Sequence, residues 1–329
     1  MSEFYWRPIP VSEGALPLAG GWLRFDHIER LSRHAPPQIL PSSAAPADVL
    51  ARLTAPRPPI MGLALDRPQI MGVVNATPDS FSDGGLHEPL RHGTALIEQG
   101  ADLLDIGGES TRPGAADISE ADELSRILPT ITALSARCPI SVDTRKAGVA
   151  GPAIRAGAGM VNDVSGLDFD PALAGVVAGS GVALCLMHAQ GVPATMQNDP
   201  RYDDVLLDVY DALQERLDRA LTAGIPRARI VLDPGIGFGK TTAHNLAILA
   251  RIGLFHALGC PVLLGVSRKR FIGEIGQAPD PLDRAPGTLA LTLAAVAQGV
   301  QMHRVHDVAV VRQGLALWRA VTERTEAGS

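Results

Sequence analysis

The chain contains little lysine, cysteine and aromatic residue, and it lacks any long run of basic or apolar residues. The net charge is −6 at pH 7, and no stretch of five or more basic residues occurs. A basic footprint of that kind is what nucleic-acid-binding proteins carry. The longest apolar run, residues 289–297, is interrupted by Thr292 and is too short to cross a bilayer. We therefore expect neither nucleic acid nor a membrane as a partner.

The cysteines are few, and none is placed for pairing. Cys138, Cys185 and Cys260 stand singly beside or inside apolar segments. An odd number of isolated cysteines is typical of reduced, buried thiols in a cytosolic protein. The N-terminal sequence MSEFYWRPIP has neither the basic region nor the apolar region of a secretory signal. These observations predict free thiols and a cytoplasmic location.

Lysine is the scarcest charged residue. Three of the 29 basic residues are lysines (Lys146, Lys240 and Lys269), and the other 26 are arginines. An ammonium group is compact whereas a guanidinium is a planar fork, so the two are not interchangeable in a tight pocket. In a chain biased towards arginine, each remaining lysine is a candidate for a role that arginine cannot fill.

The composition divides the chain near residue 67. Residues 34–59 are rich in Pro, Ala and Ser, which predicts an irregular connector. Residues 4–30 hold two of the three tryptophans and three further aromatic residues, a density that favours a docked extension over a free tail. We therefore expect an N-terminal extension with a Pro-rich connector (residues 1–67) and one larger domain (residues 68–329).

From residue 67 onward, short apolar runs alternate with segments of helical periodicity. Eight runs rich in β-branched residues begin near residues 69, 101, 139, 159, 182, 229, 261 and 301. Segments between them place apolar residues at helical spacing, as in Leu206, Val209, Leu213 and Leu217, or in Leu246, Leu249, Ile252 and Phe255. Such alternation is typical of βαβ units and a parallel sheet. Eight units in about 255 residues predict an α/β fold of the (β/α)8 TIM barrel type, with a doubly wound open sheet as the alternative.

Nearly every apolar run ends in a polar side chain with chemical capacity. In a barrel of this type, side chains at the carboxyl ends of the strands gather at one mouth, where active sites lie. One such residue could simply cap a helix, but eight strand ends of this kind predict a shared site. In chain order they carry Asn75; Asp105 and Glu109; Asp143; Asn162 and Asp163; His188; Asp233; Ser267, Arg268 and Lys269; and Arg304, His306 and Asp307.

These side chains separate into two chemical groups. The acidic and amide groups suit a heterocycle with an N–H/NH2 edge, because a carboxylate accepts two parallel hydrogen bonds from such an edge. Arg304 and His306, two residues apart on the last strand, suit a phosphate or diphosphate, which barrels often bind after strands seven and eight. A hydrogen-bonded core histidine is the alternative for His306. We therefore expect a ligand with a heterocyclic end and an anionic end.

Two long Gly-rich segments follow the first two expected strands. They read NATPDSFSDGG (residues 75–85) and GGESTRPGA (residues 107–115), and they carry Asp83, Thr111 and Arg112. Loops of this kind over a barrel mouth are candidate lids that exclude water, with an exposed connection as the alternative.

The segment DPGIGFGKTT superficially resembles a phosphate-binding P-loop. The P-loop pattern requires a glycine at the position that Pro234 occupies, so the pattern fails. We therefore reject a nucleotide P-loop, and Lys240 is most simply expected to be a loop salt-bridge partner. No Cys/His spacing matches a zinc site either.

Taken together, the segments are similar to one known family. From about Pro68 to about Asp307, in order and without a gap, they resemble the dihydropteroate synthases in the motifs NATPDSFSDGG, GGESTRPGA, SVDTRK, NDVSG, LMHAQGVPATMQ, DPGIGFGKTTAHN, SRKRFIG and RVHD. One such motif would be a weak signal, but eight together are highly specific. The extension is not part of the family core, and we expect it to pack on the barrel or on a dimer partner.

The resemblance implies an activity and partners. Members of this family are (β/α)8 barrels, commonly homodimers, and act in folate biosynthesis. They join 4-aminobenzoate to the methylene carbon of 6-hydroxymethyl-7,8-dihydropterin diphosphate, and they release diphosphate in the presence of Mg²⁺. Sulfonamides resemble 4-aminobenzoate and are expected to compete for its site. Two alternatives are a pterin-dependent methyltransferase domain and a catalytically silent pterin-binding paralogue.

The resemblance also implies which residues hold each part of the substrates. The pterin would be held by Asp143, Asn162, Asp233 and Lys269. The diphosphate would be held by Asn75, Arg304 and His306, with Asn75 also on the Mg²⁺. The 4-aminobenzoate site would use Thr111, Arg112, Pro113, Phe238 and Ser267.

The implied reaction needs no strong base. The carbon under attack is next to an electron-rich dihydropterin, so diphosphate bound to Mg²⁺ can leave first and a delocalised cation remains. The protein would then stabilise the leaving group and position the amine. Asp83 is expected to counter the cation, and Thr111, Arg112 and Lys269 complete the expected catalytic set.

Overall fold

The computed structural model describes residues 3–77, 87–110, 117–191 and 196–322. In these residues, eight parallel strands form one sheet in the order β10-β9-β8-β7-β6-β5-β12-β11. A parallel bridge between Leu232 and Val262 joins the two outer strands and closes the sheet into a barrel. The predicted (β/α)8 barrel is confirmed, and each strand begins within two residues of its expected start. The strands are β5 (Gln69–Asn75), β6 (Leu103–Gly107), β7 (Ile140–Asp143), β8 (Met160–Asp163), β9 (Ala183–Met187), β10 (Ile230–Asp233), β11 (Leu263–Leu264) and β12 (Met302–Val305).

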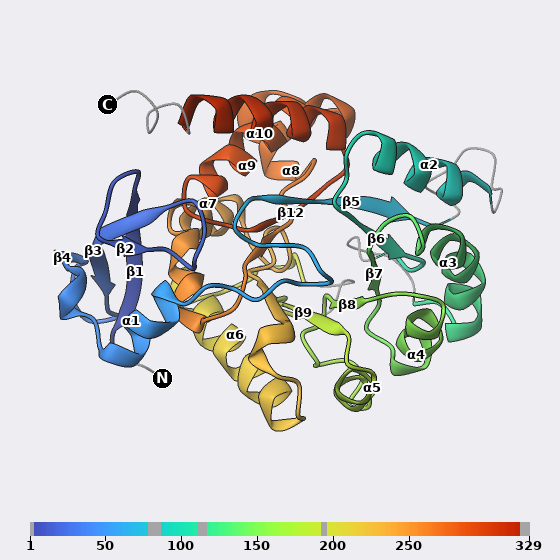
Figure 1. Cartoon of the computed structure of the whole chain (residues 1–329), viewed down its shortest axis with the longest axis horizontal. Coiled ribbons are helices and arrows are strands. Elements are labelled where there is room, and N and C mark those ends of the chain that lie inside the picture. The colour runs from blue at the N-terminus through green and yellow to red at the C-terminus, as the bar shows by residue number, and fades with distance from the viewer. Residues whose placement is uncertain (1–2, 78–86, 111–116, 192–195, 323–329) are drawn as a thin grey trace.

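Helices surround the barrel (Figure 1). In α6, the four leucine and valine positions expected to share a face are all buried. The second expected helical segment differs, because α7 ends at Ala250 and Ile252–Leu258 form the separate 3-10 helix η4, with a non-helical Arg251 between them. The α-helices are α2 (His87–Glu98), α3 (Glu120–Leu134), α4 (Ala147–Arg155), α5 (Leu173–Ser180), α6 (Val205–Thr222), α7 (Thr242–Ala250), α8 (Arg270–Gly276), α9 (Ala285–Val296) and α10 (Val308–Thr322). Two short 3-10 helices are η3 (Arg227–Arg229) and η5 (Pro281–Arg284).

Apolar side chains fill the amino-terminal end of the barrel. Met71, Leu103, Met160, Val231 and Met302 are fully buried in one cluster there. The chain that leads into β5 plugs this end with residues 60–65, which turn tightly through two residues with positive φ. The opposite end, at the carboxyl ends of the strands, is therefore the one that carries the polar side chains.

The first part of the chain forms a small antiparallel sheet beside the barrel (Figure 1). Residues 34–59 are more regular than the expected connector, because they include a strand, a 3-10 helix and an α-helix. Proline stands at or just outside the ends of these elements, where it is tolerated. The elements are β1 (Tyr5–Val11), β2 (Leu16–Pro17), β3 (Arg24–Leu31), β4 (Gln38–Pro41), η1 (Ser42–Ala44) and α1 (Ala47–Thr54).

This N-terminal sheet packs on α6 and η4. The Tyr5 hydroxyl donates to Asp211 at 2.8 Å, and Arg33 pairs with Asp211 at 2.8 Å. The Tyr5 ring packs edge-on against Tyr210. Ala257 of η4 shares an apolar cluster with residues of the sheet and α1. The extension therefore shares buried surface with the barrel domain.

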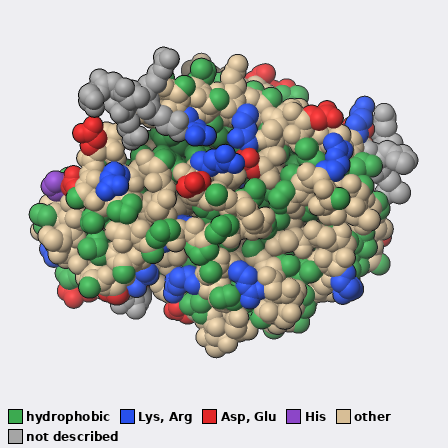
Figure 2. Space-filling view, viewed as in Figure 1, with side chains coloured by type: hydrophobic (Ala, Val, Ile, Leu, Met, Phe, Trp, Pro, Cys, Tyr) green, Lys and Arg blue, Asp and Glu red, His purple; other side chains and the backbone are tan. Residues whose placement is uncertain are grey.

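No helix in the described ranges is both long enough and apolar enough to span a membrane. All three cysteines are buried and form no disulfide, as predicted. On the face that Figure 2 displays, Lys and Arg side chains lie in small groups among acidic and apolar ones.

Candidate active site

Arg304 of β12 reaches across the barrel to carboxylates of β6 and β7. Its Nε donates to Asp105 Oδ2 at 2.6 Å, and its Nη2 donates to Asp143 Oδ2 at 2.8 Å. Asp105 also accepts from Asn162 Nδ2 at 3.0 Å and from Ser141 Oγ at 2.6 Å. The network joins Asp143 and Asn162, expected at the pterin, to Arg304, expected at the diphosphate.

Asp105 is one of the polar side chains expected at the strand ends, but it is not among the residues expected to bind a substrate. It is fully buried, and it is two residues from Leu103, which faces the barrel interior. Because side chains alternate along a strand, this spacing directs Asp105 inward as well. A buried carboxylate requires a partner, and Arg304 supplies it. The alternation in β6 was the sequence signal for an inward charge.

Burial raises the pKa of Asp143 above its usual range. The Arg304 guanidinium opposes this rise, and the nearby Asp105 carboxylate adds to it. One cation thus serves two buried carboxylates. The arrangement leaves Asp143 with capacity to share a proton or a hydrogen bond with a ligand at the mouth.

Asp233, which is buried, and Lys269, which is half-buried, are opposite charges at the same mouth. Asp233 Oδ1 accepts from the Gly235 N–H at 2.7 Å, and in the described part of the chain neither charge forms a salt bridge. Burial raises the pKa of Asp233 to about 6, opposed by the Gly235 N–H and by the positive charge of Lys269. Burial also lowers the pKa of Lys269 to about 8, helped by repulsion from Arg304. Perturbed groups of this kind, grouped at one mouth, are typical of a functional site.

The ring of Phe238 lies against Lys269. Lys269 Nζ is 4.1 Å from the ring centroid, within the range of a cation–π contact. A side chain expected at 4-aminobenzoate therefore touches one expected at the pterin. The two subsites are brought together by the loops that follow β10 and β11.

Ser267, expected at 4-aminobenzoate, contacts His306, expected at the diphosphate. The Ser267 hydroxyl oxygen lies 2.9 Å from His306 Nδ1 and accepts from the His306 N–H at 3.1 Å. Arg268, between Ser267 and Lys269, has a positive φ of 58° and pairs with Asp307 at 2.6 Å. Of the Ser267–Lys269 run, therefore, Ser267 and Lys269 join the expected site residues, and Arg268 pairs with Asp307.

Asn75 ends β5 at the same mouth and is half-buried. In the described residues, no group of three or more His, Cys, Asp or Glu side chains could hold a metal ion. Mg²⁺ needs no such cage, because it usually keeps several waters and binds through one or two protein oxygens together with substrate phosphates. The Asn75 carboxamide oxygen fits that requirement.

Four expected residues, Asp83, Thr111, Arg112 and Pro113, lie outside the described residues.

Comparison with known proteins decides the family. The pterin-binding enzyme family model matches residues 71–306. The dihydropteroate synthase of Escherichia coli K12 is 44% identical over 242 residues, which cover 72% of this chain and 85% of that protein. The chain belongs to the dihydropteroate synthase family. The family, the fold and the enzyme class expected from the motifs, a transferase of folate biosynthesis, are thereby confirmed.

Solved structures of dihydropteroate synthases resemble this one closely. One, from Xanthomonas albilineans with 4-aminobenzoic acid, has a TM-score of 0.76 and 47% identity, covering 81% of this chain and 98% of that chain. Another from the same organism, in complex with 7,8-dihydropteroate, has a TM-score of 0.72 and 45% identity, covering 79% of this chain and 95% of that chain.

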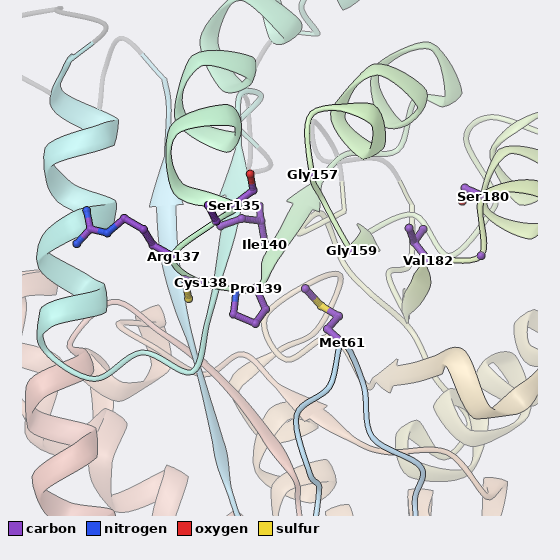
Figure 3. Close-up of a pocket in the computed structure, with 12 residues that line it drawn as sticks. Met61, Ser135, Arg137, Cys138, Pro139, Ile140, Gly157, Gly159, Ser180 and Val182 are labelled. Carbon is purple, nitrogen blue, oxygen red and sulfur yellow. The ribbon is translucent and has the colours of Figure 1, made fainter.

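A hollow at the opposite end of the barrel carries no comparable chemistry. It lies beside Met61 at the amino ends of β7, β8 and β9 (Figure 3). Its lining is mainly backbone and small or apolar side chains, with Arg137 at one side. We therefore place the site at the polar mouth alone.

Lys146, one of the three lysines, binds residues on both sides of the segment 111–116. Its Nζ donates to Glu109 at 3.0 Å, to Glu123 at 2.8 Å and to the Ile118 carbonyl at 2.8 Å. Glu109 and Ile118 lie on either side of residues 111–116. Lys146 therefore joins the two ends of the segment that carries the expected Thr111 and Arg112.

Proposed function

We propose that this chain condenses 6-hydroxymethyl-7,8-dihydropterin diphosphate with 4-aminobenzoate to give 7,8-dihydropteroate and diphosphate. The observation that carries the proposal is the Arg304 network, which places a cation between the pterin-side carboxylate Asp143 and the buried Asp105 at the barrel mouth. A ligand with a heterocyclic end and an anionic end matches that arrangement. The family membership supports the same reaction.

The pterin end of the substrate would be read by buried polar groups. The Asp233 carboxylate would accept hydrogen bonds from the 2-amino group and N3–H, because an ionised carboxylate binds such an edge in two parallel bonds. Asp143 and Asn162 would bind further ring heteroatoms. Lys269 would donate to the carbonyl and N5 side of the ring. Burial of Asp143, Asn162 and Asp233 excludes water and strengthens each of their contacts.

The diphosphate end would be held by Asn75, Arg304 and His306. When Mg²⁺ is bound, it would neutralise charge on the departing diphosphate. Asn75 would offer an oxygen to the metal ion. Arg304 and His306 would hold diphosphate oxygens at the end of β12, the position where barrels often bind phosphate.

The amine of 4-aminobenzoate would be positioned for attack without prior deprotonation, and it would lose one proton to the released diphosphate or to water after the C–N bond forms. An arylamine is already nucleophilic, so placement at the methylene carbon is the main requirement. Phe238 would supply an apolar wall and Ser267 a hydroxyl, with Thr111, Arg112 and Pro113 completing the subsite. Asp83 would counter positive charge on the pterin after diphosphate leaves.

A homodimer in the cytoplasm is part of the proposal. Support comes from α10, which exposes Leu317 (64% accessible) and Val321 (75% accessible) one helical turn apart. An apolar stripe on the outside of the barrel is a surface that a second copy would cover. The free, buried cysteines suit a reducing compartment.

The test is diphosphate release from the purified protein given the pterin diphosphate, with and without 4-aminobenzoate, in Mg²⁺ and in EDTA. The proposal predicts release that requires Mg²⁺, rises with 4-aminobenzoate and yields 7,8-dihydropteroate. Tight pterin binding with no condensation under any of these conditions would refute it and favour the silent paralogue.

A further inference from the structure

Lys240 is the lysine to which no role has been given so far. It lies in the loop that joins β10 to α7, and its side chain is buried. The expected salt bridge is wrong, because Lys240 has no ion-pair partner in the part of the chain that the structure describes. Lys146, by contrast, pairs with Glu109 and Glu123. A buried ammonium without a carboxylate partner requires another explanation.

Four acceptors from two loops enclose the Lys240 ammonium. Its Nζ lies 2.9 Å from His188 Nδ1, 2.9 Å from the Gly235 oxygen, 3.0 Å from the Phe238 oxygen and 3.3 Å from the His188 oxygen. An ammonium has three N–H donors around one small centre, which suits a compact cage of this kind. A planar guanidinium is larger and presents its donors as a fork. The cage therefore accounts for a lysine at this position in an arginine-rich chain.

The two loops that Lys240 joins are in direct backbone contact. A Cβ added to Gly235, where φ is +66°, would lie 1.8 Å from the His188 oxygen. A Cβ added to Gly239, where φ is +60°, would lie 2.5 Å from the Gln190 oxygen. The Tyr202 hydroxyl donates to the Gly239 carbonyl at 2.7 Å. The backbones of the two loops are thus packed too closely at Gly235 and Gly239 to admit a side chain there.

That loop carries parts of the proposed site. The Gly235 N–H binds Asp233, and the Phe238 ring lies beneath Lys269. Both residues also give their carbonyl oxygens to Lys240. Without the ammonium, the Phe238 carbonyl would lose the donor that Lys240 supplies, and the Gly235 carbonyl would keep only the Phe238 N–H at 3.1 Å. The ring that contacts Lys269 would then lose its tether to Lys240.

The charges around this loop are also coupled. Three cations face Asp233, namely Lys240 in its own loop, Lys269 after β11 and Arg304 in β12. Lys240 itself faces Asp233, the cations Lys269 and Arg216, and the His188 imidazole. Burial lowers the pKa of Lys240 to about 7, opposed by the Asp233 carboxylate, so Lys240 carries its full charge only below neutral pH. In that range it is one of the charges that favour the ionised form of Asp233.

We propose that Lys240 is a positioning residue for the condensation: its caged ammonium ties the loops after β9 and β10 together, holds Phe238 against Lys269 and places a positive charge near Asp233. The inference rests on the proposed function. It adds a residue that touches no substrate but fixes two groups that do.

The experiment compares Lys240→Met, Lys240→Arg and His188→Leu with wild type, using Arg155→Met as a control for loss of an exposed cation on α4. Steady-state kcat and KM for each substrate are measured across the acidic and neutral range. Thermal unfolding and circular dichroism report how much of each variant is folded. Lys240→Met removes both tether and charge, Lys240→Arg keeps the charge alone, and His188→Leu removes one acceptor and keeps the charge.

We expect Lys240→Met to lower kcat/KM for 4-aminobenzoate by about 100-fold, the loss that misplaced groups typically cause. The acidic limb of its pH profile, the range in which the KM for the pterin substrate rises as Asp233 becomes protonated, should move to higher pH. The reason is that Asp233 loses a favourable cation. Lys240→Arg should keep the wild-type limb without recovering kcat, and His188→Leu should lower kcat with an unchanged limb. If Lys240→Met does not fold, the two other variants decide the question.

Three results would overturn the inference while the proposed function stands. They are wild-type kinetics in Lys240→Met, full recovery of kcat in Lys240→Arg, and losses in all three variants that match their unfolded fractions. An inactive wild-type protein would instead refute the proposed function. Arg155→Met should match wild type throughout.

Discussion

At the scale of single residues, burial and function act against each other at Asp233. Pterin binding requires the ionised carboxylate, whereas burial favours the neutral form and raises its pKa to about 6. Nearby cations oppose this effect and keep the value below neutral pH. The site is thus charged under ordinary conditions, at a cost in folding stability.

The first prediction concerns the pH dependence of pterin binding. Because Asp233 becomes protonated as the pH falls through about 6, the affinity for a pterin probe should decrease below that pH. Asp233→Asn should bind the probe weakly at every pH and lose this transition. Isothermal titration calorimetry at several pH values measures both effects. If the transition were unchanged in Asp233→Asn, protonation of a group other than Asp233 would be its cause.

The same substitution should stabilise the empty protein. The folded-state pKa of Asp233 is raised, so ionisation destabilises the folded state progressively between the ordinary value of 3.8 and about 6, and fully above that. At neutral pH, Asp233→Asn should therefore raise the free energy of unfolding by about 1 to 3 kcal/mol, at 1.36 kcal/mol per pKa unit. Urea unfolding at neutral pH and near pH 4 checks this, because the difference should shrink at the lower pH.

At the scale of elements, the turn after β10 provides the next prediction. Gly235→Ala would place a methyl group against the His188 oxygen and strain a positive φ. Gly224→Ala is a matched control, since Gly224 also has a positive φ (+90°) but nothing lies within 4 Å of its added Cβ. We expect Gly224→Ala to cost about 1 kcal/mol from backbone strain alone, and Gly235→Ala to cost clearly more and to lower activity. Equal stability and activity in the two variants would contradict the close packing of this turn.

The elements differ in how well the sequence predicts them. The eight barrel strands are predictable because strands buried on both faces appear as short apolar runs, and their polar ends indicate the mouth. The division between α7 and η4 was not predictable, since the apolar spacing continues across Arg251 while the backbone there leaves the helical region. The role of Asp105 depends on Arg304, 199 residues away, and no local pattern encodes that contact. Local periodicity thus predicts elements, whereas pairing across the barrel requires the fold.

At the scale of the whole molecule, the N-terminal sheet acts as part of the barrel's packing. Trp22 Nε1 donates to the Val296 carbonyl at 3.1 Å, and Arg57 donates to the His256 carbonyl at 3.0 Å. Removal of residues 1–66 would break these contacts and expose the apolar surface around Ala257. We expect the truncated protein to lose more than about 3 kcal/mol of stability, comparable to large losses from a core, or to be insoluble. Unchanged thermal unfolding and activity in the truncated protein would show that the sheet is dispensable.

The outer surface of α10 leads to the last prediction, which concerns assembly. Val310, Leu317 and Val321 recur at spacings of seven and four residues, so they share one exposed face of the helix. In a two-fold dimer the same face meets itself, and a charge placed there would be buried beside its own copy. Leu317→Glu should therefore convert a dimeric wild type to a monomer in analytical ultracentrifugation. Ile39→Glu, on the exposed strand β4, changes an equally accessible apolar residue (68% exposed) and should leave the dimer intact. A monomeric wild type would contradict the proposed dimer. Dissociation by Ile39→Glu alone would place the interface elsewhere.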